Sequence, residues 1–202
     1  MLVAALVLGL AACTSTGDSD AGEAPSSSAT PPAPPLPTTV KVGVVTGRVG
    51  AQEKERAVSN VTRAVDGWFD AAYVAGDYPR AAFDDAFPRF TKGAAKEAVQ
   101  DEALMSNADI GSRIDRVTPK ARRLTIDLLG VRGVAQAATA RVRLVFVTEG
   151  EVARRVTVSG RLRLVRQNRV WRVFGYDVTK GQRPVGGRES GSASPSGSGA
   201  AS

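Results

Sequence analysis

Few side chains in this sequence are suited to acid–base or nucleophilic chemistry. The chain of 202 residues contains no histidine and one cysteine, Cys13, so the side chain that most often transfers protons near neutral pH is absent. A catalytic role would fall to a carboxylate with a raised pKa, such as Asp66, or to a tyrosine, such as Tyr73. We expect Asp66 on the solvated side of a helix and Tyr73 with its hydroxyl at the rim. The sequence therefore favours a protein that is not an enzyme.

Metal and cofactor sites are not predicted either. A chain without histidine and with a single cysteine cannot supply the ligand clusters that hold zinc. The pair Asp84-Asp85 is too short to indicate a calcium loop. The stretch 43–50 contains several glycines but lacks the lysine and the spacing of a phosphate-binding loop. We expect no cofactor and no metal ion.

Arginines alternate with apolar residues in two segments near the C-terminal end. Even-numbered apolar positions in 140–148 and 156–164 define a core side, so the odd-numbered arginines face the other way. A two-residue turn at Gln167-Asn168 would set Arg172 opposite Arg163 and Phe174 opposite Arg161, with Tyr176 further along the same face. The predicted basic face comprises Arg141, Arg143, Arg161, Arg163 and Arg172.

Three interpretations of this basic face remain open. Like charges on neighbouring strands are mildly unfavourable, and Asp127, on the same face of the preceding strand, can pair with only one or two arginines. The face could be a solvated surface whose arginine stems cover the sheet. It could instead bind an acidic partner or polymer, or be covered by a second subunit in a homodimer.

Helical spacing precedes the strands. Apolar residues recur every three or four positions from Glu53 to Ala75, which predicts a helix. Asp77-Tyr78-Pro79 suggests the start of a second helix carrying Phe83, Phe87 and Phe90. Thr91 is expected to cap a third helix that ends near Met105, and Pro88 is expected to break or bend the chain between the second and third.

The period changes to two after Asp109, which predicts antiparallel strands joined by short turns. The apolar positions lie at 124–128, 142–146, 156–164 and 170–178, and the stretch 40–49 could add a short strand before the first helix. Trp171 and Val173 are expected to face the core. Helices followed by strands predict an α+β domain, in which N-terminal helices pack on a curved antiparallel sheet of four or more strands.

This order resembles the NTF2-like, or cystatin-like cone, superfamily. The residues that carry the resemblance are the helical run 65–73, the turn 75–78 and the final 170–173, and together they resemble extracytoplasmic proteins of high-GC Gram-positive bacteria such as Mce-associated proteins. The resemblance implies a pocket between helices and sheet, which enzymes of the superfamily line with Asp, His and Tyr. A fold likeness carries little information on function.

The N-terminal segment resembles a bacterial lipoprotein signal peptide. A short apolar run ends in Leu10-Ala11-Ala12-Cys13, which implies a signal peptide over 1–12 and a diacylglyceryl group on Cys13. Residues 13–37 are rich in Pro and Ser and predict a disordered tether, 38–183 the NTF2-like domain, and 184–202 a disordered tail. The expected location is the extracytoplasmic face of the cell membrane.

Charge is divided unevenly within the predicted domain. Residues 53–109 contain seven basic and eleven acidic side chains, whereas 110–183 contain seventeen basic and five acidic ones. Such a basic half could bind nucleic acid, but export from the cytoplasm argues against that partner.

The favoured function is a lipid-anchored, non-catalytic binding or scaffold domain of the cell envelope. Its cleft could hold an apolar ligand or peptide, and its basic face would contact anionic lipid, a wall polymer or an envelope protein. The alternative is a small-molecule enzyme of the NTF2-like isomerase or dehydratase type, with an Asp/Tyr pocket.

Overall fold

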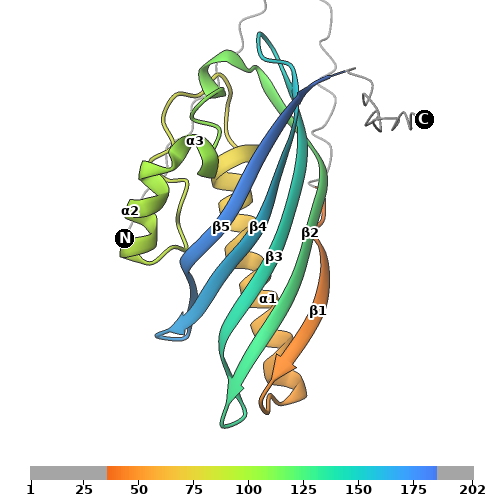
Figure 1. The fold of residues 1–202 in the computed structure, drawn as a ribbon, viewed down its shortest axis with the longest axis vertical. Helices are drawn as coiled ribbons and strands as arrows, with labels where there is room; N and C mark the ends of the chain where they lie inside the picture. The colour runs from red at the N-terminus through yellow and green to blue at the C-terminus, as the bar shows by residue number, and fades with distance from the viewer. Residues whose placement is uncertain (1–35, 186–202) are drawn as a thin grey trace, which may run out of the picture. The chain divides into compact units, whose positions relative to one another are not determined.

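The structure, a computed structural model, describes residues 36–185 as helices packed on one five-stranded sheet (Figure 1). The strands lie side by side in the order in which they occur along the chain. The strands are β1 (Thr39–Thr46), β2 (Arg116–Val131), β3 (Val134–Glu149), β4 (Arg154–Gln167) and β5 (Val170–Pro184). The helices are α1 (Ala51–Phe69), a π-helical turn (Asp70–Val74), α2 (Lys92–Gln100), α3 (Glu102–Met105) and a short 3₁₀ turn (Gly111–Arg113).

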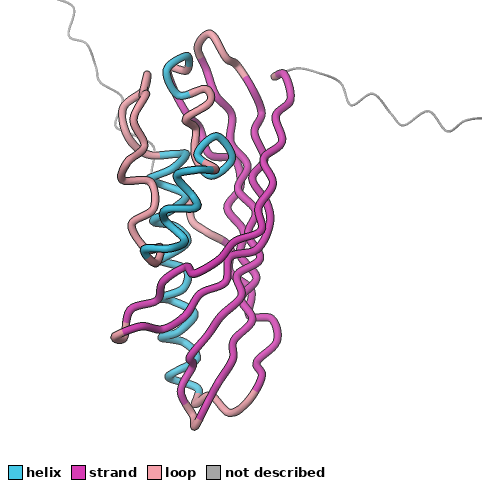
Figure 2. Tube along the Cα trace, turned by 60° about the vertical axis from the view of Figure 1, so that its left-hand side comes forward, coloured by secondary structure: helices cyan, strands magenta, loops and turns pink. Residues whose placement is uncertain are grey.

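The helices lie on one side of a curved sheet, which confirms the predicted α+β class (Figure 2). The expected strand before the first helix exists as β1, but it runs parallel to β2, so the prediction of a wholly antiparallel sheet is wrong. The reason is the connection: the chain crosses over the sheet through α1 before it enters β2, and such crossovers join parallel strands. The other three pairs are antiparallel.

Helix α1 forms as its spacing predicts. The side chains of its sheet-facing side are buried, and the π-helical turn continues the same side with Ala72 and Tyr73. A helix with one apolar face gains most of its stability from burying that face. The buried residues of α1 are Ala57, Val61, Ala64, Val65, Trp68 and Phe69.

The predicted second helix is wrong. Residues 77–90 form turns and irregular backbone, although Phe83, Phe87 and Phe90 are buried as a helix face would be. Two prolines interrupt the segment, and each lacks a backbone N–H. The end of the segment pairs instead with β5: Val173 N–H donates to the Arg89 carbonyl and Thr91 N–H to the Val173 carbonyl, both at 2.8 Å. Burial of aromatic residues here reflects packing, not helical periodicity.

The predicted third helix begins where expected. The Thr91 side chain accepts a hydrogen bond from the Ala94 N–H at 3.4 Å, and α2 follows it. A break at Asp101 separates α2 from α3, which ends at Met105.

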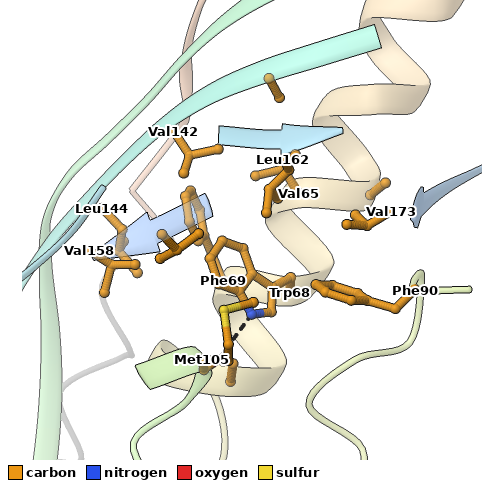
Figure 3. Packing of buried hydrophobic residues seen from close by; sticks show 14 of the residues in the cluster. Val65, Trp68, Phe69, Phe90, Met105, Val142, Leu144, Val158, Leu162 and Val173 are labelled. Carbon is orange, nitrogen blue, oxygen red and sulfur yellow. Dashed lines mark hydrogen bonds between the residues drawn. The ribbon is translucent and has the colours of Figure 1, made fainter. Parts of the chain in front are cut away.

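The space between α1 and the sheet is filled by side chains (Figure 3). Trp68 is fully buried, and its indole N–H donates to the Met105 carbonyl at 3.0 Å. Its ring lies 5.2 Å from that of Phe69, 5.5 Å from Tyr73 and 6.3 Å from Phe90, centroid to centroid. These aromatic residues occupy the place where the NTF2-like resemblance implied a ligand pocket.

Lys180, in the C-terminal half of β5, binds α3 and the segment that follows it. Its ammonium donates to the carbonyls of Ala103 and Ser106 at 2.9 and 2.7 Å and to Asp109 Oδ1 at 2.5 Å. Burial lowers the pKa of Lys180, and the Asp109 carboxylate opposes that shift. The helical segment and the sheet are therefore joined in both halves of β5.

Several predicted features lie outside the described residues. They are the signal peptide, Cys13 and most of the tether and of the C-terminal tail. Within 36–185, no helix combines the length and the apolar composition needed to cross a membrane.

Candidate functional site

Arginines of β2, β3 and β4 lie on the face of the sheet that is turned away from α1. Arg141 lies opposite Arg161 across the β3–β4 ladder, and Arg143 lies opposite Arg123 across the β2–β3 ladder. Their side chains are exposed, while alternate residues such as Val142 and Leu162 are buried against the helix. We call this surface the outer arginine face; it consists of Arg123, Arg141, Arg143, Arg161 and Arg163.

Arg172 does not lie opposite Arg163, so this predicted pairing is wrong. The β4–β5 turn consists of Asn168 and Arg169, one residue later than predicted, with φ values of 48° and 64°. Both positive φ values suit a type I′ hairpin turn. The later turn sets Arg172 opposite Val165, which lies on the same side of β4 as Arg163, so Arg172 keeps its predicted face but not its predicted partner. The Arg172 guanidinium donates instead to the Phe90 carbonyl at 3.5 Å.

A bulge in β5 reverses the predicted sides of its later residues. Leu164 pairs with Val173 and Arg163 with Gly175, which leaves Phe174 as an extra residue. Tyr176 therefore lies on the core side, opposite Leu162, and donates to Asp101 Oδ2 at 2.7 Å. Its predicted place among the arginines is wrong. Trp171 and Val173, before the bulge, are buried as predicted.

Asp127 neutralises one arginine of the outer face and fixes β1. Its carboxylate accepts from the Arg141 guanidinium at 2.8 and 3.1 Å and from the Val44 N–H at 2.8 Å. A Cβ at Gly43 would lie 2.0 Å from Asp127 Oδ1, so only glycine permits this approach. Asp127 thus holds a bulge of β1 and pairs with a single arginine, within the predicted one or two.

The other four arginines of the outer face form no salt bridge within residues 36–185. Asp177 lies opposite Arg161 in the ladder without a salt bridge to it. A shallow depression of about 300 Å³ lies between Arg141, Arg161, Asp177 and Thr179. The surface therefore presents clustered positive charge that the described residues neutralise only in part, and it can bind anions.

Arg123 was not predicted as part of this face, although the alternation of apolar residues in β2 places it there. Residues 124, 126 and 128 set the core side of β2, so position 123 had to share the face of Asp127. The same alternation places Arg122 on the core side, where a charged residue is unexpected.

Arg122, which is buried, forms an ion cluster with two partly exposed carboxylates of the helical segment. Its side chain is 6 % exposed; it donates to Asp70 and lies 4.0 Å from Asp66 Oδ1. Asp66 also accepts from the Thr38 hydroxyl at 2.6 Å. Burial raises the pKa of Asp66, against the lowering effects of Thr38 and Arg122. The expectation that Asp66 lies on the solvated side of its helix is wrong.

Tyr73 is likewise not at the rim. Its side chain is fully buried, and its hydroxyl donates to the Leu104 carbonyl at 2.7 Å. Burial raises the pKa of the Tyr73 hydroxyl well above its usual value. Asp66 and Tyr73 thus have separate partners, and the structure does not join them in the Asp/Tyr pocket of the enzyme alternative.

The chain matches no protein-family model, no curated protein sequence and no solved structure. Within the described part of the chain, no group of three or more His, Cys, Asp or Glu side chains is placed to hold a metal ion. The outer arginine face is therefore the candidate functional site.

Proposed function

We propose that this protein is a lipid-anchored, non-catalytic binding or scaffold domain of the cell envelope, at the extracytoplasmic face of the membrane. Its outer arginine face binds an anionic membrane surface. We further assign the domain to the NTF2-like fold, an assignment supported by the packing of α1 on one face of a curved sheet. The lipid anchor is proposed from the Leu10-Ala11-Ala12-Cys13 sequence.

The observation that carries the proposal is the concentration of unpaired arginines on one open face. Arg123, Arg143 and Arg163 come from three adjacent strands, are exposed, and form no salt bridge with a described residue. No described helix covers this face, because α1 packs on the opposite one. Mutual repulsion among these side chains falls when anions lie between them.

A lipid surface suits this face better than a small ligand does. The arginines are spread over three strands, and a membrane presents many headgroups at once. Each basic residue near an anionic membrane contributes roughly 1 kcal/mol to binding. One lipid chain and one basic surface together bind more stably than either alone. The proposal therefore assigns the acyl chains and the arginines to the same membrane.

The proposed anchor is tested by the mass of the mature N-terminus. Membrane and soluble fractions of cells that produce the full chain are compared by mass spectrometry, with Cys13→Ser as the control. We expect a membrane-bound chain that begins at Cys13 and carries diacylglycerol, and loss of that species in Cys13→Ser. Unmodified full-length protein in the cytoplasm would refute the anchor.

The outer arginine face is tested with the full-length Cys13→Ser chain, so that no acyl group contributes. Its binding to vesicles of phosphatidylcholine with or without phosphatidylglycerol is measured by sedimentation at low salt. Changing Arg123, Arg143 and Arg163 to Glu is expected to weaken binding to the anionic vesicles at least about 100-fold, given roughly 1 kcal/mol for each basic residue. Binding should also fall as salt is added.

A matched control separates the face from overall charge. Arg56, Lys92 and Lys96 are exposed on the helices without a salt bridge among the described residues, and changing them to Glu alters net charge equally. This control should retain most of the vesicle binding. Equal losses in both variants would reject the face as the site. So would a change from dimer to monomer in the face variant with vesicle binding unaltered, since the face would then be a subunit interface.

A further inference from the structure

A second basic site lies on the helix side of the molecule, separate from the outer arginine face. A cleft of about 200 Å³ opens between α1, the segment before α2 and the β4–β5 turn. Its lining includes Asn60, Arg63, Arg89, Arg169 and Trp171. Three arginines from three distant parts of the sequence therefore line one small space.

Each of the three arginines stands on a fixed piece of backbone. Arg63 belongs to α1, and its Nη1 donates to Asn60 Oδ1 at 2.8 Å. The Arg89 carbonyl accepts from the Val173 N–H at 2.8 Å, which holds this loop against the edge of β5. Arg169 occupies the two-residue turn with a φ of 64°. Ligand binding would therefore require little ordering of the backbone.

Positive charge in the cleft is not neutralised by the described residues. No acidic side chain belongs to the lining, and none of the three arginines forms a salt bridge within 36–185. Arg166, at the end of β4 close by in sequence, is different: it pairs with Glu53 at 2.8 Å. The contrast indicates that the cleft arginines remain available for an external anion.

We propose that this cleft binds a phosphate monoester group. Guanidinium forks donate paired hydrogen bonds to phosphate oxygens, and a terminal phosphoryl group offers three acceptor oxygens to donors arriving from three elements. The volume is below the range of about 300–1,000 Å³ that encloses a drug-sized ligand, so the cleft would hold the anionic end of a larger molecule. Trp171 supplies an apolar wall beside that group.

Calorimetry on the full-length Cys13→Ser chain tests the site, with glycerol 3-phosphate as the ligand and glycerol and acetate as controls. We expect binding of the phosphate ester alone, with a shift of the Trp171 indole N–H signal in the NMR spectrum. Changing Arg63 and Arg169 to Gln should weaken binding at least about tenfold. Changing Arg143 and Arg163 to Gln removes the same amount of charge from the outer face and should leave the binding of glycerol 3-phosphate unaltered.

Vesicles containing phosphatidic acid distinguish a lipid headgroup from a soluble ester. Loss of vesicle binding in the Arg63/Arg169 variant, with glycerol 3-phosphate too weak to detect, would support the cleft as a headgroup site. Equal affinity for acetate, equal losses of glycerol 3-phosphate binding in both double variants, or an Arg63/Arg169 variant that matches the parent chain in both assays would overturn the proposal. Circular dichroism melts confirm that each variant is folded. The outer-face experiment does not bear on this outcome, because it alters none of the cleft residues.

Discussion

Replacing Arg122 with methionine is expected to lower the free energy of unfolding by about 3 kcal/mol, because two carboxylates would lose their buried counter-charge. Arg122 is 6 % exposed and contacts both Asp66 and Asp70. These carboxylates are partly solvated, with side-chain exposures of 29 % and 45 %, so the loss should lie near the lower end for broken buried pairs. Urea unfolding of the variant and the parent chain measures the difference.

The matched control removes the carboxylates as well. In the triple variant Arg122→Met, Asp66→Asn, Asp70→Asn no unpaired charge remains, and most of the lost stability should return. An unfolding midpoint for Arg122→Met equal to that of the parent chain would show that the ion cluster contributes nothing net.

The same variant has a defined dependence on pH. The pKa of Asp66 is already raised above 3.8 by burial, so its contribution to stability is full below that pH and is lost as pH rises through the folded-state value. Removing the nearby guanidinium should raise the pKa of Asp66 further, as measured by NMR titration of its carboxyl carbon. The destabilisation should therefore be largest near neutral pH and decrease as Asp66 takes up a proton. A lower pKa in the variant would contradict the assigned attraction.

Replacing Trp68 with alanine should cost about 4 kcal/mol of unfolding free energy, since large aromatic truncations in a core cost about 3–5 kcal/mol. The indole is fully buried between α1, the sheet and α3, and it contacts three aromatic rings. Its loss also leaves the Met105 carbonyl without its donor. Urea unfolding followed by far-ultraviolet circular dichroism measures the change.

Trp68→Phe is the matched control, because it keeps a ring but cannot donate to Met105. Its expected loss is about 1–3 kcal/mol, the range for leaving a buried acceptor unsatisfied. Similar losses for the two variants would mean that the hydrogen bond, and not the packing of the ring, dominates. A loss below 1 kcal/mol for Trp68→Ala would show that this part of the core can collapse around the gap.

The periodicity of apolar residues correctly predicted the helix and the strands that bury one face without irregularity. Helix α1 bears a regular apolar face, and β3 and β4 alternate without interruption through the arginine pairs, so four arginines could be placed on one face from sequence. The same alternation, which placed Asp127 on this face of β2, also places Arg123 there. The spacing of apolar residues was sufficient to predict these elements because each of them packs against a single layer.

Single-residue irregularities limited the remaining predictions. One residue of difference in the β4–β5 turn moved Arg172 away from Arg163, and one extra residue at Phe174 moved Tyr176 to the opposite face. The later turn moved the partner of each β5 residue by two positions along β4, which kept the predicted faces, whereas the single extra residue at Phe174 reversed the side of every position after it. The helix predicted for residues 77–90 is wrong for another reason. The aromatic residues of this segment follow the shape of the core, and its last residues pair with an edge strand.

The two edges of the sheet differ in how each is closed to pairing with another strand. A sheet edge exposes unpaired backbone groups to which another chain can add. At β5, the backbone around Phe90 already occupies part of that edge. At β1, the strand is short and the bulge between Val42 and Val45, held by Asp127, interrupts the regular ladder. By holding this bulge, Asp127 keeps the edge irregular where β1 exposes valines at 42, 44 and 45, and an irregular edge disfavours pairing with another strand.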